Sequence, residues 1–282
     1  MSVMDERNES NTDLERVDIF TVVNNYFLLF FCLSCMLASM YLQQMFLMIH
    51  QYRIGISVSA VLGIILPLYL LTRRFAMGFR RQLRLARPRV QPLVVVVMAT
   101  LATVIIVDHV YLISQRFSPV PEYYTDSLRD LKPHDAWTFT LTFLGLCVLV
   151  PLAEEMAFRG VIQQIFSRNM GPVLGFLLAG LAFGAVHLNA HLLVSISFFG
   201  VFLGFVYYAT GNLAYTIVAH SLFNAVALAQ LTAMPLDAPY EIPFYLRDVR
   251  FFVVALVLLV YFTFKIKQGG SETEPPYETE HH

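Results

Sequence analysis

Charged side chains are scarce in this sequence. They make up 14% of its 282 residues, against about 25% in typical soluble domains. Hydrophobic residues reach 57%, above the roughly 45–50% of such domains. A soluble fold of this size needs more charge than this to cover its surface. The composition therefore excludes a soluble globular enzyme.

Other shortages exclude further classes. The net charge is −1, so no overall basic field attracts nucleic acid and no nucleic-acid partner is expected. Only three cysteines are present, which is too few for a disulfide framework. Cys32 and Cys35 form a C-x-x-C pair inside an apolar run. Because a thiol in apolar surroundings is unreactive, we interpret them as packing residues rather than a redox pair.

Long apolar runs are what the sequence has instead. A membrane-spanning helix needs about 20 mostly apolar residues, and eight runs approach this length. The runs are continuous rather than alternating, which excludes transmembrane strands. The sequence predicts an all-α integral membrane protein with about eight transmembrane helices. The predicted spans are residues 19–42, 54–71, 92–113, 138–158, 172–189, 191–209, 213–233 and 251–266.

The membrane domain is predicted at residues 19–266, between two polar tails. The N-terminal tail, residues 1–18, has six acidic residues and no basic n-region, so a cleaved signal peptide is not expected. The C-terminal tail, residues 267–282, is acidic and predicted to be disordered. We give its final residues, His281 and His282, no role.

The basic residues predict the orientation in the membrane. Eight spans place both termini on one side, together with 13 of the 19 Lys and Arg residues. Seven of these lie between Arg73 and Arg89. The positive-inside rule therefore places both termini in the cytoplasm, although the same cluster is also consistent with an anionic-lipid patch. The sequence gives no indication of the oligomeric state.

Three carboxylates fall inside predicted spans, where burial of an ionisable group is costly. The other 17 of the 20 belong to tails and loops. Asp108 lies near the end of its span beside His109, and both are expected to reach the interface. Glu154 and Glu155 follow an apolar run and are the clear exceptions.

Polar residues recur at helical spacing in three places within 71 residues. Glu155 and Arg159 are i,i+4 neighbours that can pair, which leaves the adjacent Glu154 available. Small residues separate Phe183 from His187, one turn further on, and allow another helix to approach. The third place is the run from His220 to Asn224, whose two ends share one helix face.

Together these groups suit hydrolysis in an intramembrane cavity. Glu154 is placed to take a proton from water, a histidine to orient that water or to pass the proton on, and His220 and Asn224 to donate to an oxyanion. Two alternatives stay open: a non-catalytic membrane scaffold or regulator held by the same polar cluster, and a proton-coupled transporter. Of these, the scaffold is the stronger, because no repeated pair of broken spans is present.

A zinc site is a further alternative. Glu154, His187 and His220 are possible ligands with one open position. His187 and His191 have H-x-x-x-H spacing, but Leu188 replaces the glutamate that a zincin helix needs. We therefore interpret His191 as an interfacial or supporting residue.

The three motifs resemble those of the CPBP family, the CAAX proteases and bacteriocin-processing proteins, also called Abi. The family pattern is EExxxR, FxxxH and HxxxN or HxxxD; the sequence has EEMAFR at 154–159, FGAVH at 183–187 and HSLFN at 220–224. Gly160 matches the FRG ending common in bacterial members. The resemblance covers about residues 138–233 and implies a CAAX-protease-like bundle with an intramembrane polar cavity.

The resemblance also implies roles. By it, Glu154 and His187 activate water, His220 and Asn224 form the oxyanion hole, and Glu155, Arg159 and Phe183 are supporting residues. It favours a glutamate mechanism without metal over a zinc one. The implied substrate is a membrane-associated or lipidated protein or peptide, met among membrane lipids. A bacterial plasma membrane is favoured, or the endoplasmic reticulum if the protein is eukaryotic.

One geometric tension follows from the predicted spans. Glu154 lies toward the cytoplasmic end of its span, whereas His187 comes late in the next one, so their depths differ by several ångströms. We expect the span limits to shift, or one helix to be partly re-entrant, such that His187 lies close to Glu154 and His220.

Overall fold

The computed structural model describes residues 19–74, 83–233 and 243–270. The predicted tails at 1–18 and 271–282 lie outside these residues. The described chain is a bundle of helices and contains no strand. The helices, in chain order, are α2 Ile19–Val22, α3 Asn25–Met48, α4 Tyr52–Ser59, η1 Ala60–Ile65, α5 Leu66–Arg74, α7 Val90–Ser114, α8 Glu122–Leu131, α9 Ala136–Phe143, η2 Leu144–Leu149, α10 Val150–Ala157, η3 Phe158–Ile162, α11 Gln163–Met170, α12 Pro172–Ala185, α13 Leu193–Thr210, α14 Leu213–Ala233, η4 Phe244–Leu246 and α15 Val249–Gly270.

Within the described residues, seven helices are long and apolar enough to cross a membrane, where eight spans were predicted. The outer faces of α3 and α15 expose large apolar side chains such as Phe30 and Val257, and only 17% of the apolar window in α15 is buried. Exposed apolar surface of this extent fits contact with lipid. The multi-pass membrane fold predicted from composition is therefore confirmed.

The first and last predicted spans have shifted limits. The first predicted span divides, because the side chain of Asn24 accepts hydrogen bonds from the backbone nitrogens of Tyr26 and Phe27 and so caps a new helix, α3. The last helix, α15, continues to Gly270, so residues 267–270 are helical rather than part of a disordered tail.

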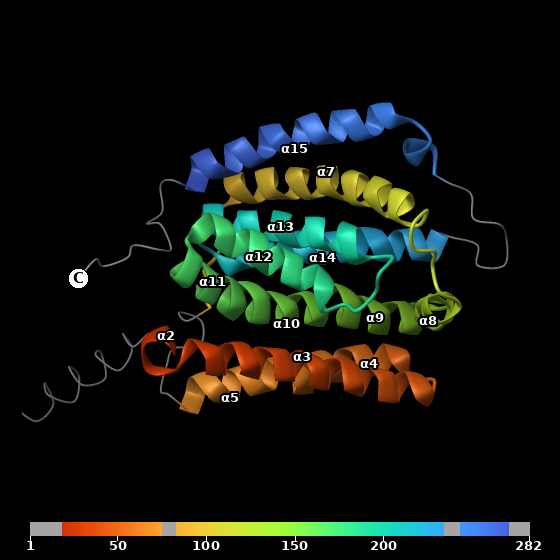
Figure 1. Cartoon of the computed structure of the whole chain (residues 1–282). Coiled ribbons are helices and arrows are strands. Elements are labelled where there is room, and N and C mark those ends of the chain that lie inside the picture. Colours follow the sequence, from red (N-terminus) through yellow and green to blue (C-terminus); the bar gives the residue numbers. More distant parts are fainter. Residues whose placement is uncertain (1–18, 75–82, 234–242, 271–282) are drawn as a thin grey trace, which may run out of the picture.

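The fifth predicted span, residues 172–189, is wrong in its length. Helix α12 has 14 residues, or about 21 Å at 1.5 Å per residue, which is shorter than the roughly 30 Å hydrocarbon core. The helix stops because the chain turns after Ala185 and Leu188 adopts a left-handed backbone with φ of 52°. Figure 1 shows the non-helical segment 186–192 as the loop that joins α12 to α13.

The predicted loop at 159–171 is wrong as well. A continuous helical segment of 35 residues, Ala136–Met170, carries the chain past the predicted end of this span. Arg159 was one of the 13 basic residues assigned above to loops and tails on the cytoplasmic side. It is instead fully buried in this helix. The helix buries the charge of Arg159 because its ion-pair partner, Glu155, lies one turn earlier on the same helix.

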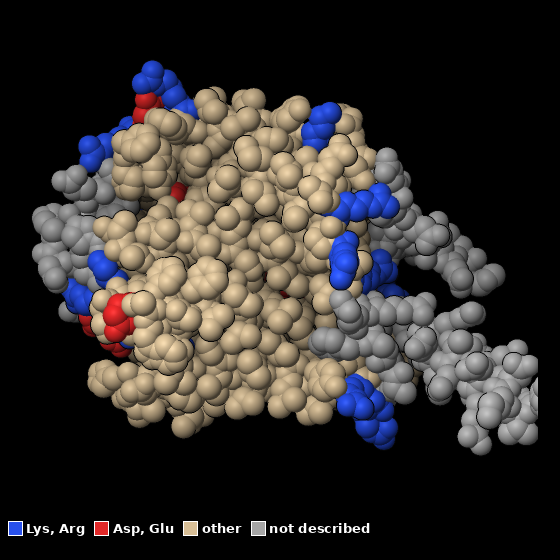
Figure 2. All heavy atoms as spheres, turned by 180° about the vertical axis from the view of Figure 1, so that it is seen from behind, with Lys and Arg blue, Asp and Glu red and all other residues tan. Residues whose placement is uncertain are grey.

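The two ends of the bundle differ in charge. Figure 1 shows α2 and the end of α15 at the same end of the bundle, with α8 at the opposite end. We call these the basic end and the α8 end. Figure 2 shows blue side chains without red ones at the basic end and both colours at the α8 end. The described cations of the basic end are Arg73, Arg74, Arg84, Arg87, Arg89, Arg168, Lys265 and Lys267.

Close helix packing brings the site together. An ideal Cβ on Gly184 of α12 would collide with Ser197 Oγ and lie 2.7 Å from the Ser197 backbone nitrogen on α13. The small residue therefore lets the two helices approach, as predicted for this motif. The core between the helices includes Met156, Phe158 and Leu203, all at most 1% exposed.

We expect Gly184→Ala to lower the free energy of unfolding by about 1–3 kcal/mol, because the added methyl group must displace α13. Thermal unfolding in detergent measures the effect. Gly269→Ala is the matched control, since its Cβ would meet only Pro92 Cγ, at 3.9 Å. Equal melting temperatures for the two variants would contradict the close approach.

Candidate active site

Glu155 and Arg159 form a buried ion pair at the centre of the bundle. Their side chains are 0% exposed and Arg159 Nη1 donates to Glu155 Oε1 over 2.9 Å. The second guanidinium nitrogen, Nη2, donates to the Gly200 carbonyl on α13 over 2.8 Å. The guanidinium also lies over the Phe183 ring, 4.8 Å from its centroid. The pair predicted from i,i+4 spacing is present and ties α10 to two other helices.

His220 joins the same carboxylate from α14. Its Nδ1 lies 2.9 Å from Glu155 Oε1, and because a buried carboxylate paired with arginine is an acceptor, Nδ1–H is the donor. The other ring nitrogen, Nε2, lies 3.8 Å from Glu154 Oε2. That distance is too long for a direct hydrogen bond and short enough for both atoms to contact one water molecule. Glu155 thus fixes the ring so that Nε2 faces Glu154.

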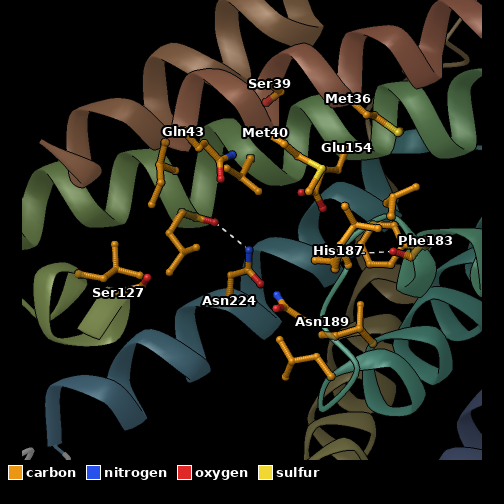
Figure 3. Close-up of a pocket in the computed structure, with 18 of the residues that line it drawn as sticks. Met36, Ser39, Met40, Gln43, Ser127, Glu154, Phe183, His187, Asn189 and Asn224 are labelled. Atoms are coloured by element: carbon orange, nitrogen blue, oxygen red, sulfur yellow. Dashed lines mark hydrogen bonds between the residues drawn. The ribbon is translucent and has the colours of Figure 1, made fainter. Parts of the chain in front are cut away.

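Glu154 differs from its neighbour in exposure. Its side chain is 23% exposed, and it lines a cavity of about 560 Å³. Adjacent helix positions point about 100° apart, which is why one carboxylate enters the buried pair and the other reaches the cavity. Figure 3 shows Glu154 pointing into this space from α10.

His187 enters the same cavity from the end of α12. Its Nδ1 lies 2.7 Å from the Phe183 carbonyl one turn earlier, so Nδ1–H donates, and in the neutral ring Nε2 carries the free lone pair. The ring stacks at a tilt on Phe183, with centroids 5.1 Å apart. Figure 3 shows His187 and Glu154 facing the cavity from opposite helices. With α12 ending at Ala185, His187 lines the same cavity as Glu154 and His220.

Asn224 lies in the cavity wall, one turn along α14 from His220. Its Nδ2 donates to the carbonyl of Leu146 in η2 over 2.8 Å, which is the dashed contact to α14 in Figure 3. An amide nitrogen carries two hydrogens, so one remains for a ligand. The π-helical segments η2 and η3 flank α10 directly, and such segments are frequent at functional sites.

The structure therefore brings four predicted residues, Glu154, His187, His220 and Asn224, to one cavity. Within the described residues, no three His, Cys, Asp or Glu side chains form a group that could hold a metal ion. His191 lies outside the cavity lining. It is 1% exposed and its ring packs on Tyr124 at 4.6 Å, and this burial lowers its pKa.

Asp108 and His109, near the end of α7, pack against other elements of the bundle. Asp108 Oδ2 accepts hydrogen bonds of 2.9 Å from Gln230 Nε2 and from the Tyr245 hydroxyl. His109 is buried and packs against Phe252 of α15. The two hydrogen bonds to Asp108 tie α7 to α14 and η4, because both of its partners lie far along the chain.

Sequence reasoning missed two walls of the cavity. Helix α3 contributes Met36, Met40 and Gln43, and the short helix α8 contributes Tyr124 and Ser127. The amphipathic pattern of α8 was the available signal for its existence. In α3 the available signal was the i,i+4 pair of Ser39 and Gln43, which lie on one face of an otherwise mostly apolar helix.

The four candidate residues lie within the range of a known domain. Residues 136–226 match the family model described as type II CAAX prenyl endopeptidase Rce1-like. No curated protein and no solved structure matches the chain. The match confirms the resemblance to the CPBP family that three motifs predicted over about the same residues.

Proposed function

We propose that this chain, whose residues 136–226 form an Rce1-like CAAX endopeptidase domain, hydrolyses peptide bonds within the membrane. One observation carries the proposal. Glu154 opens to the cavity beside two histidines and an amide, whereas its neighbour Glu155 is buried and neutralised by Arg159. Glu154 approaches His220 Nε2 only at 3.8 Å and forms no close ion pair there, and an intramembrane carboxylate of this kind is a functional group by default.

In the proposed mechanism Glu154 takes a proton from water while the water oxygen attacks the substrate carbonyl carbon. His187 Nε2 accepts a hydrogen bond from the other O–H of that water and so orients the water. The proton on Glu154 then passes to the departing amine as the carbon–nitrogen bond breaks. No metal ion is needed for any of these proton transfers.

The oxyanion is stabilised by the second Nδ2–H of Asn224 and by Nε2–H of His220. Because Nδ1–H of His220 already donates to Glu155, donation from Nε2 requires the doubly protonated ring. The charges of the site then balance, because the two carboxylates of Glu154 and Glu155 face two cations, Arg159 and the imidazolium of His220. One oxyanion donor is worth about 3–4 kcal/mol of transition-state stabilisation.

The proposed setting is a multi-pass cell membrane, with a bacterial plasma membrane favoured and both termini in the cytoplasm. The charge asymmetry in Figure 2 supports this orientation, because the described charged side chains at the basic end are all lysine or arginine. The substrate is a membrane-associated or lipidated polypeptide that reaches the cavity among membrane lipids.

The proposal is tested by comparing the protein termini in cells that express wild-type protein or Glu154→Gln. We expect mass spectrometry to detect one or more new amino termini in membrane or secreted polypeptides only with the wild type. Equal sets of termini, together with an unchanged cellular phenotype, would favour a membrane scaffold that uses the polar cluster for packing.

A further inference from the structure

The catalytic cavity is closed toward the basic end of the bundle. Phe158, Phe183 and Phe199 line its inner limit and are each 1% exposed. The rings of Phe158 and Phe183 pack edge to face with centroids 4.9 Å apart, and Arg159 lies directly beneath them. A substrate cannot pass this aromatic floor without unpacking the core.

The cavity extends instead toward the α8 end. Its lining follows α3 from Met36 to Leu47, near the end of that helix at Met48. It also takes in Ser127 of α8 and Asn189 of the segment 186–192. Figure 3 shows Gln43, Ser127 and Asn189 around the space that leads away from Glu154. The open part of the cavity thus faces the end of the bundle opposite the described cations Arg73, Arg74 and their neighbours.

The cavity wall is also nearly uncharged. Among its lining residues Glu154 is the one carboxylate, and neither lysine nor arginine is present. Beyond the catalytic groups the polar members are hydroxyl and carboxamide side chains, such as Gln43, Gln44 and Ser127. Such groups suit a peptide backbone. The imidazolium of His220 is already balanced by the carboxylates of the site, so a free carboxylate would approach Glu154 with no surplus cation to compensate it, which is unfavourable in a partly desolvated site.

We propose that the cavity takes a neutral polypeptide segment from the α8 face, which is the outer face of the membrane, and cleaves at an internal bond. That a peptide bond is cleaved rests on the proposed function, and that the substrate enters from the outer face rests on the positive-inside rule. The substrate class is an exported or translocated polypeptide. A cytoplasmic CAAX protein does not fit, because its scissile bond lies three residues from a free C-terminal carboxylate.

Cysteine accessibility tests the direction independently of catalysis. In a background with Cys32, Cys35 and Cys147 replaced by serine, single cysteines are placed in the cavity mouth (Asn189→Cys), at the α8 end (Arg250→Cys) and at the basic end (Lys267→Cys). We expect a membrane-impermeant maleimide to label positions 189 and 250 in intact cells, and position 267 only after permeabilisation. Labelling of position 189 only after permeabilisation, or in neither state, would overturn the proposal.

Peptide cleavage tests the preference for a neutral segment. The probes are two apolar peptides of one sequence, with a free carboxylate or a carboxamide three residues after the scissile bond. We expect a higher kcat/KM for the amide. Gln43→Lys should shift this preference toward the free acid by at least about tenfold, as close charge pairs at interfaces do. Gln51→Lys, at the exposed start of α4 outside the lining, adds the same charge and should leave the ratio unchanged.

The outcomes separate the two proposals. Equal rates for both peptides, or no shift with Gln43→Lys, would overturn the preference for a neutral segment while leaving proteolysis intact. Cleavage of neither peptide, with termini in cells also unchanged by Glu154→Gln, would count against the proposed function. In that case the maleimide result would still fix the face to which the cavity opens.

Discussion

Glu154→Gln is expected to lower kcat for peptide cleavage by about 10²–10⁴-fold, the usual contribution of a positioned general base, and to leave the melting temperature unchanged. Glutamine keeps the shape of the side chain but does not accept a proton from water. Stability is retained because Glu154 is partly exposed and lies 3.8 Å from its nearest ionic partner, His220. Cleavage of the amidated peptide and thermal unfolding of the same detergent preparation measure the two effects.

The neighbouring Glu155→Gln is the matched comparison. It makes the same chemical change one residue away, but removes the acceptor shared by Arg159 and His220. We expect it to lower both the melting temperature and the rate. If Glu154→Gln lowered the melting temperature as much as Glu155→Gln does, Glu154 would be a structural residue. If it cleaved the peptide at the wild-type rate, another group would be the base.

The contrast between these two glutamates was available from the sequence. A carboxylate pair before an arginine at i+4 predicts that only one carboxylate can be neutralised along the helix, and the structure assigns that role to Glu155. Local spacing was sufficient because both ends of the interaction lie on one helix. The same holds for Phe183 and His187, whose contact spans a single turn.

Contacts between helices were less accessible to sequence reasoning. Nothing in the pattern around His220 indicated that its Nδ1 would choose Glu155, 65 residues away, over Glu154. The partner of Asn224, the Leu146 carbonyl, depends on the packing of η2 against α14. Such partners follow from three-dimensional packing, and no periodicity along one helix encodes them.

Span limits failed for a related reason. Hydropathy counts apolar residues but does not register a polar side chain satisfied by a distant partner. Arg159 and Gln163 end an apolar run, yet both are fully buried in a helix that continues to Met170. Gln163 Nε2 donates to the Gly204 carbonyl on α13 over 2.9 Å. The reverse error occurred after Ala185, where apolar composition continued but the helix did not.

Arg159→Met is expected to lower the free energy of unfolding by about 3–5 kcal/mol, because it leaves Glu155 buried without its cation. The side chain it removes is fully buried and makes two charge-assisted hydrogen bonds, to Glu155 Oε1 and to the Gly200 carbonyl. Thermal or denaturant unfolding in detergent measures the loss. Arg74→Met, at an exposed position of α5, is the control and should cost little.

A double-mutant cycle isolates the charge interaction from lost packing. The double variant Glu155→Leu with Arg159→Met removes both charges, so it should be less destabilised than the two single effects added together. The difference between the summed single effects and the effect of the double variant is the coupling energy, for which values of about 0.5–3 kcal/mol are usual between contacting residues. Additive effects would mean that the two side chains do not interact in the folded protein.

The lysine variant separates geometry from charge. Arg159→Lys keeps one positive charge but offers a single ammonium in place of a planar fork. Arginine uses two nitrogens to bond Glu155 and the Gly200 carbonyl while its plane lies over the Phe183 ring. The single ammonium of lysine cannot reproduce this arrangement. We therefore expect lysine to recover only part of the stability. Because Glu155 also positions His220, the lysine variant should cleave peptide more slowly even where it remains folded. Full recovery of stability and rate by lysine would show that charge alone holds the site.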